Sequence, residues 1–221
     1  MPYAPATLGG PDVPVVLTER LVDVTEDIDV RTATMRHSRT VAAYAEMIAR
    51  ELRFSEPAVE EIGLAGLLHD IGKIGISERI LCKPDRLKHA EWIEMRNHAR
   101  LGASIVEDAG LEEISGWVLC HHERPDGRGY PLGLQGDAIP LEARILAVAD
   151  AYEAMTNDRV YRDAIGHTRA RAELRCNAGT QFDEDVVAAF LCALADRPFA
   201  IHEITDDSLH VPPARGSLRW S

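Results

Sequence analysis

The stretch EEIGLAGLLHDIGKIG, residues 60–75, decides how the rest of the sequence is interpreted. Its apolar residues run through Ile62, Leu67 and Leu68 and stop at the pair His69 and Asp70. A helix with an apolar run of this kind packs against a protein core, where an unpaired imidazole and carboxylate cost several kcal/mol to bury. A bound metal ion would remove that cost. The stretch therefore predicts a core helix that ends at a metal site.

Helical spacing continues on both sides of this stretch. Apolar residues recur every three or four positions over about 37–52, at Val41, Tyr44, Ala45, Ile48 and Leu52. Ser55 and Pro57 are typical of a helix start, and Gly72 is typical of a helix end. The pattern is helical from Val15 onward, with further helices expected over about 89–107, 111–122, 140–156, 167–177 and 183–194. Because no segment has a convincing strand pattern, we expect an all-α bundle without a substantial sheet.

Proline and glycine divide the chain into three parts. Residues 1–14 are rich in both and are expected to form a flexible leader, residues 15–196 one helical domain, and residues 197–221 a C-terminal tail. Within the domain, residues 82–87 and 123–139 are irregular in pattern. The second segment is glycine-rich, and a loop of this length is uncommon in a compact domain unless it has a function.

The composition indicates one globular domain and excludes several classes of protein. The chain has 221 residues, of which 46% are hydrophobic and 27% charged. Its formal net charge of −12 disfavours DNA, RNA and anionic membranes as partners. No stretch approaches the roughly 20 apolar residues of a membrane span, and no signal peptide is evident. The four cysteines, Cys82, Cys120, Cys176 and Cys192, form no C-x-x-C pair. We therefore expect them to be reduced thiols and the protein to be cytoplasmic.

Metal-ligand side chains occur at five places, and three of these, the pairs at 69–70 and 121–122 and the residue at 150, end or interrupt an apolar segment. The five places are His37, the pair His69 and Asp70, His98, the pair His121 and His122, and Asp150. Adjacent residues on a helix point about 100° apart, so a neighbouring pair serves two ions better than one. We therefore expect a dinuclear centre with a bridging Asp70, of the kind that cleaves phosphodiesters. The alternative is a structural role, with each ring bonded to a carboxylate or carbonyl, and we expect this for His89, His167, His202 and His210.

Two motifs in the chain resemble the signature motifs of the HD-GYP family. The first is HDIGKIG at 69–75, and the second is HHE at 121–123 followed by DGRGYP at 126–131. Both are intact and in the family's order, and the similarity covers roughly residues 36–191. The resemblance implies an HD-type helical bundle with a dinuclear metal centre. It also implies hydrolysis of cyclic di-GMP, a bacterial second messenger.

The resemblance assigns a role to each matching residue. One metal ion would be bound by His37, His69, Asp70 and Asp150, and the other by Asp70, His98, His121 and His122. Lys73 would act in catalysis beside Asp70, facing the scissile phosphate, and the substrate contacts would come from Arg162, Tyr130 and Arg128. Members with a third metal carry glutamate where this chain has Ala33, so two divalent ions are expected. Iron or manganese is favoured by the family, and zinc or nickel also suits these ligands.

The expected function is a metal-dependent phosphodiesterase that converts cyclic di-GMP to pGpG, with slow onward conversion to GMP. Two alternatives stay open. One is an HD phosphohydrolase that acts on another nucleotide, and the other is a catalytically weak module that senses cyclic di-GMP or docks a signalling protein. The Gly-Tyr-Pro loop is expected to shape the substrate entrance and to offer that docking surface. A homodimer is a further hypothesis.

Overall fold

The computed structural model describes residues 15–32, 36–157 and 164–196. The expected leader and tail, Ala33 and Arg162 lie outside the described residues. The elements are α1 (Val15–Arg31), α2 (His37–Glu51), α3 (Glu56–Leu68), η1 (Ile71–Gly75), α4 (Glu78–Leu81), α5 (His89–Arg96), α6 (His98–Asp108), α7 (Glu112–Cys120), η2 (Gly136–Ala138), α8 (Leu141–Thr156), α9 (His167–Cys176) and α10 (Glu184–Asp196). One isolated bridge, between Ala178 and Phe182, is the only strand pairing in these ranges, so the all-α class is confirmed.

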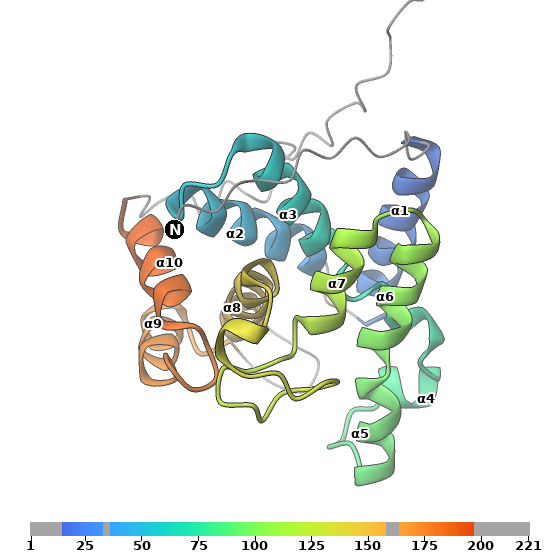
Figure 1. Ribbon diagram of the computed structural model, residues 1–221. Coiled ribbons are helices and arrows are strands. Elements are labelled where there is room, and N and C mark those ends of the chain that lie inside the picture. Colours follow the sequence, from blue (N-terminus) through green and yellow to red (C-terminus); the bar gives the residue numbers. More distant parts are fainter. Residues whose placement is uncertain (1–14, 33–35, 158–163, 197–221) are drawn as a thin grey trace, which may run out of the picture.

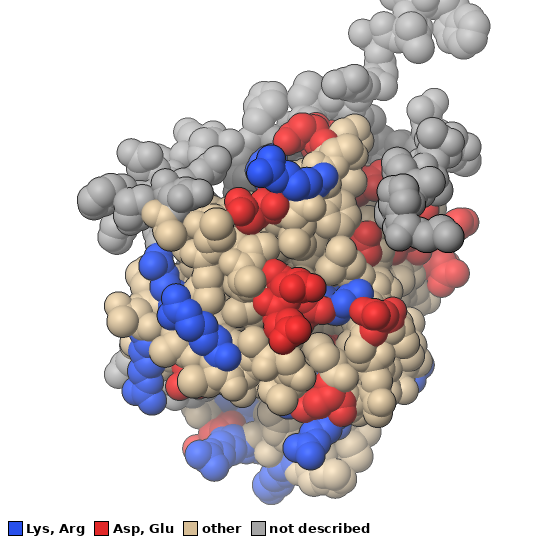
Figure 2. Space-filling model, turned by 60° about the vertical axis from the view of Figure 1, so that its left-hand side comes forward, with Lys and Arg blue, Asp and Glu red and all other residues tan. Residues whose placement is uncertain are grey.

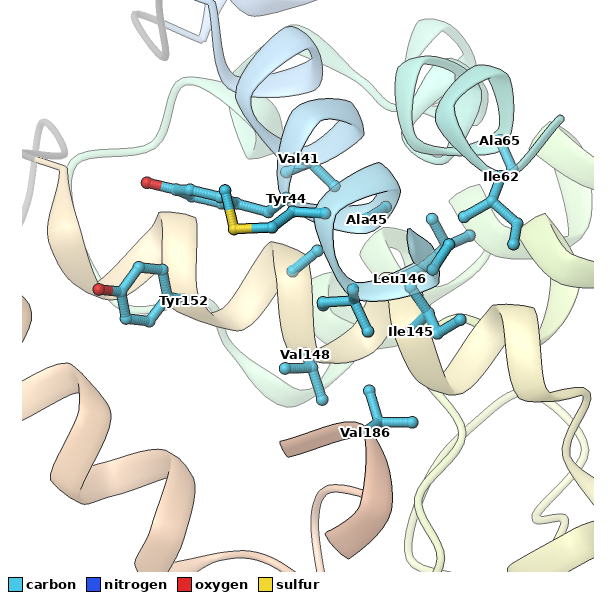
Figure 3. Close-up of a cluster of buried hydrophobic side chains, with 14 of the residues drawn as sticks. Val41, Tyr44, Ala45, Ile62, Ala65, Ile145, Leu146, Val148, Tyr152 and Val186 are labelled. Atoms are coloured by element: carbon cyan, nitrogen blue, oxygen red, sulfur yellow. The ribbon is translucent and has the colours of Figure 1, made fainter. Parts of the chain in front are cut away.

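Helix α2 is the centre of the bundle. It packs against α3, α8 and α10, while α6 packs against α7 and η1 (Figure 1). Buried side chains from α2, α3, α8 and α10 meet in the core shown in Figure 3, which labels Val41, Ile62, Leu146 and Val186 among others. The rings of Tyr44, Tyr152 and Phe190 close this core, with centroids 4.9–5.4 Å apart. Such a core holds the ends of the helices in fixed positions.

The helix expected to end at Gly72 is shorter than predicted. Helix α3 ends at Leu68, and the chain continues through a turn into the 3-10 helix η1. A side chain at Gly72 has no room, because a Cβ atom there would lie 2.0 Å from the carbonyl oxygen of His98. This close contact between η1 and α6 fixes the turn that carries His69 and Asp70.

The single helix expected over 89–107 is wrong, because the structure has two helices that meet at Asn97. The backbone N–H of Asn97 donates to the carbonyl oxygen of Glu94 (3.0 Å), which tightens the chain between α5 and α6. His98 then begins α6 and is 2% exposed, whereas α5 buries none of its side chains. The two helices therefore differ in burial, since α6 packs into the fold and α5 does not. The spacing of apolar residues does not indicate this difference.

Charged side chains on the face drawn in Figure 2 have both signs. On that face the acidic side chains gather near the centre, and lysine and arginine side chains lie along the left side and the lower edge. The net charge of −12 disfavours a polyanion such as DNA as a partner.

The contact between α2 and α3 requires a glycine at position 66. A Cβ atom on Gly66 would lie 2.7 Å from the Cα atom of Ala42. We expect Gly66→Ala to lower the free energy of unfolding by about 1–3 kcal/mol, the usual effect of overpacking. Gly116→Ala is the matched control, because a Cβ on that helical glycine meets nothing within 4 Å. Urea unfolding of both variants measures the difference, and a Gly66→Ala variant as stable as Gly116→Ala would contradict the packing.

Candidate metal centre

The residues predicted to bind metal lie together at the ends of four helices and on the side of a fifth. They come from the start of α2, the end of α3, the start of α6, the end of α7 and the middle of α8. All are buried except His122 and Asp150, which are partly buried; the side chain of Asp150 is 22% exposed. Three sets offer ligand atoms within 4.8 Å of one another: His98, His121 and His122; His37, His69 and Asp70; and His37, Asp150 and Glu153.

Asp70 stands between two groups of imidazoles. Its Oδ2 atom lies 3.3 Å from Nε2 of His69 and 3.5 Å from Nε2 of His37. Its Oδ1 atom lies 3.5 Å from Nε2 of His98, which belongs to the other group. The two oxygens of one carboxylate thus face two candidate metal positions, which is the arrangement of a bridging ligand. Lys73, three residues further on, forms an ion pair with Oδ2.

The rings of four histidines are held so that Nε2 points into the cluster. In three of them a hydrogen bond from Nδ1 to the carbonyl oxygen three residues earlier fixes the orientation of the ring. These bonds join His69 to Gly66 (2.8 Å), His98 to Met95 (2.7 Å) and His121 to Val118 (2.6 Å). Nδ1 of His37 instead donates to a carboxylate oxygen of Glu153 (2.6 Å). With a proton fixed on Nδ1, Nε2 is the ring nitrogen that can bind a metal.

An unpaired atom at the centre fits a metal ion. Nε2 of His69 is buried and has no hydrogen-bond partner among the described residues, although Asp70 lies 3.3 Å away. A buried nitrogen in this position costs free energy unless something binds it. Together with the surrounding nitrogen and carboxylate donors, this atom indicates that the residues fit divalent metal ions.

The imidazoles of the second group are neutral. Burial lowers the pKa of His98, and burial followed by repulsion from His69 and His98 lowers the pKa of His121 to about 3. Burial likewise holds the pKa of His122 well below its ordinary value. Because only a neutral imidazole binds metal, this group is in its ligating form at neutral pH.

The carboxylates change the balance in the first group. Burial lowers the pKa of His37, but its hydrogen bonds to Asp70 and Glu153 outweigh burial and raise the pKa to about 10. Burial would raise the pKa of Asp70, yet the ammonium of Lys73 and the ring of His69 hold it well below its ordinary value. A cation that binds this group displaces a proton from His37, so metal affinity there increases with pH.

Two carboxylates that the sequence analysis did not assign complete the site. Glu153, 3% exposed, orients His37 and lies three residues after Asp150 on α8, a spacing that places both on one helix face. Glu123, 2% exposed, accepts hydrogen bonds from the backbone N–H groups of residues 132 (2.5 Å), 133 (3.1 Å) and 134 (3.0 Å). An acid directly after the histidine pair was the available signal for Glu123. Through these hydrogen bonds Glu123 joins the Gly-Tyr-Pro loop to the end of α7.

The Gly-Tyr-Pro loop covers one side of the cluster. The ring of Tyr130 lies 4.7 Å from that of His122, with 32° between their planes. Gly129 allows this approach, because a Cβ atom there would lie 2.5 Å from the backbone of Glu123. Arg128 is exposed, and its backbone N–H donates to Asp126 (3.0 Å), so its substrate contact stays a prediction. The contact predicted for Arg162 falls outside the described residues.

Comparison with known proteins identifies the family. The profile of the HD domain matches residues 24–186, which is most of the chain and includes every residue of the cluster. The chain belongs to the HD-domain family. The resemblance to HD-GYP proteins is confirmed by relatives of this HD domain. One is named a probable cyclic di-GMP phosphodiesterase of Vibrio cholerae, 38% identical over 76% of the chain and 41% of the relative. Another is a cyclic di-GMP phosphodiesterase of Pseudomonas aeruginosa, 42% identical over 75% of the chain and 40% of the relative.

Not all relatives of this HD domain are named for the same nucleotide. A third, named a 3'3'-cGAMP-specific phosphodiesterase of Vibrio cholerae, is 39% identical over 73% of the chain and 35% of the relative. The chain therefore spans about two fifths of the length of these relatives.

No helix in the described ranges is long and apolar enough to cross a membrane.

Solved structures share the HD-domain fold. A cyclic GMP-AMP specific phosphodiesterase of Vibrio cholerae superposes with a TM-score of 0.66 at 20% identity, covering 86% of this chain and 51% of the other. An HDGYP protein from Bdellovibrio bacteriovorus superposes with a TM-score of 0.61 at 17% identity, covering 83% and 65%. At these identities the likeness concerns the fold alone.

Removing the central carboxylate should empty the site. We expect Asp70→Ala to lose tightly bound metal, because two cations cannot stay close together without the anion between them. Elemental analysis of the purified protein measures this, with circular dichroism to establish that the variant folds. Asp108→Ala, which removes an exposed carboxylate at the end of α6, is the control and should keep the metal. Wild-type metal content in Asp70→Ala would refute the assignment.

Glu153 should matter for metal affinity without being essential for folding. Glu153→Gln weakens the charged hydrogen bond that orients His37, so we expect metal affinity to fall about 10–100-fold. Competition with a chelating dye measures this affinity. Glu142→Gln, in the first turn of the same helix and outside the cluster, should retain the wild-type value. Equal affinities for the two variants would show that Glu153 does not orient a ligand.

Proposed function

We propose that the chain is a metal-dependent phosphodiesterase that hydrolyses cyclic di-GMP. The observation that carries this proposal is the position of Asp70 between two groups of imidazoles. Relatives named as cyclic di-GMP phosphodiesterases, or as probable ones, which are 38% and 42% identical to the chain, support the substrate. The chain matches only about two fifths of the length of these relatives, so cyclic di-GMP is proposed as its substrate.

The cluster would hold two ions. His37, His69, Asp70 and Asp150 would bind one, and Asp70, His98, His121 and His122 the other. Two bound divalent ions supply the activated water and the Lewis acidity that phosphodiester hydrolysis needs. The donors suit iron, manganese, nickel and zinc, and we favour iron or manganese from the HD-GYP resemblance.

The protein's own side chains position the reacting groups. The hydrogen bonds on Nδ1 fix the imidazole rings before any ligand arrives, so no reorganisation is needed at the site. Lys73 places a positive charge beside Asp70, where it can offset the charge of a phosphodiester. Burial raises the pKa of the Tyr130 hydroxyl, which keeps it a neutral hydrogen-bond donor next to His122.

The first product is expected to be the linear dinucleotide pGpG, with slow conversion to GMP. We place the reaction in the cytoplasm, where cyclic di-GMP acts. The Gly-Tyr-Pro loop, fixed by Glu123, offers a defined surface on which a signalling protein could dock.

A comparison of substrates tests the proposal. The manganese- or iron-loaded protein is incubated separately with cyclic di-GMP, 3'3'-cGAMP and a generic phosphodiester, and the products are separated by chromatography. The proposal expects cyclic di-GMP to disappear and pGpG to appear. Preferred turnover of 3'3'-cGAMP would favour another nucleotide as substrate. Binding of cyclic di-GMP without turnover would favour a sensor or interaction module.

Lys73 should contribute to the rate and not to metal binding. We expect Lys73→Ala to lower turnover about a hundredfold while metal content is unchanged, because a single charge contact in the transition state contributes on this scale. Steady-state kinetics and elemental analysis measure the two quantities. Arg79→Ala removes an exposed cation from the neighbouring helix α4 and should be as fast as wild type. An equally fast Lys73→Ala would assign Lys73 to a structural ion pair.

A further inference from the structure

Helix α5 presents one face that nothing in the described residues covers. Its opposite side is held by polar contacts: Glu91 accepts a hydrogen bond from Lys83 (2.6 Å), and Glu94 accepts one from Ser77 (2.7 Å). Four side chains at helical spacing i, i+3, i+4 and i+7 form the uncovered face and line a surface hollow. They are His89, Trp92, Ile93 and Arg96. Trp92 is 46% exposed and Ile93 62%. Helix α5 lies at one extremity of the fold, beyond the start of α6 (Figure 1).

A line of stacked groups joins this hollow to the metal centre. The guanidinium of Arg96 lies 5.9 Å from the ring centroid of Trp92 and 4.9 Å from that of Tyr130. The ring of Tyr130 in turn lies 4.7 Å from that of His122. Arg96 is therefore a cation placed between an exposed indole and the residues that surround the cluster. The hollow is therefore linked to the candidate site through the contacts of Arg96 and Tyr130.

We propose that this face of α5 is a nucleobase subsite, in which Trp92 and Arg96 stack a purine of the cyclic dinucleotide. The inference rests on the proposed function. An indole ring and a guanidinium plane are the side chains on which proteins stack unpaired bases. With one phosphodiester of the substrate at the metal centre, a base on the far side of the ring needs support outside the buried cluster, and Trp92 offers it.

Charge favours a nucleotide over a protein segment as the occupant. The chain has a net charge of −12, so an anionic ligand needs local cations, and Arg96 beside Tyr130 and Lys73 beside Asp70 supply them. Stacking reads the face of a base and not its edges, so it does not distinguish guanine from adenine. The subsite should therefore strengthen the binding of cyclic di-GMP and 3'3'-cGAMP to a similar degree.

Substitution of Trp92 in the full, metal-containing chain tests the subsite. We expect Trp92→Ala and Trp92→Leu to raise KM for both cyclic dinucleotides about tenfold, the scale of a lost base stack, with little change in kcat. Trp92→Phe keeps an aromatic face and should retain most of the affinity. The dissociation constant of the bis-phosphorothioate analogue of cyclic di-GMP, measured by equilibrium dialysis, should follow KM. Metal content and circular dichroism establish that each variant is folded.

Each outcome separates the subsite from the proposed function. Turnover by wild type with an unchanged KM in Trp92→Ala overturns the subsite alone, and so does full rescue by leucine, which has no ring. Binding that depends on Trp92 without turnover supports the subsite and overturns the phosphodiesterase. A dimer that Trp92→Ala dissociates, with KM unchanged, would assign this face to a second copy of the chain and overturn the subsite. Failure of wild type to bind either dinucleotide overturns both.

Discussion

One buried carboxylate, Asp70, is the constraint on which the rest of the structure depends. It is 3% exposed, and a buried charge is stable only when other charges or donors surround it. The bundle meets this requirement by directing four helix ends and one side of α8 toward one point. The starts of α2 and α6 and the ends of α3 and α7 all reach Asp70 or its neighbours, and the close contact of Gly72 with α6 fixes the turn that carries it.

The same construction prepares the site before a ligand binds. A histidine at a helix end can donate Nδ1 to the carbonyl three residues earlier, and His69, His98 and His121 all do so. The local helix geometry therefore sets the direction of each ring without a partner from elsewhere in the fold. His37, at the start of α2, is held instead by a carboxylate oxygen of Glu153 on α8. Helix ends that bring ligands also supply their orientation.

The sequence was sufficient for the features that are local. His69, Asp70, His121, His122 and Asp150 end or interrupt apolar runs, so these runs indicated both the core and most of the cluster. The role of Glu153 could not be seen in this way, because its partner His37 lies 116 residues away in the chain. The break between α5 and α6 was missed for a related reason. Both segments have helical spacing, and only tertiary packing buries one and leaves the other, with Trp92, exposed. The predictions for Ala33 and Arg162 fall outside the described residues.

The central claim is that one carboxylate joins two metal positions. Anomalous diffraction from a crystal of the metal-loaded protein, recorded at the absorption edge of the bound metal, tests it most directly. The account predicts two peaks, one among His37, His69 and Asp150, the other among His98, His121 and His122, with the side chain of Asp70 between them. A single peak, or peaks that do not flank Asp70, would contradict it.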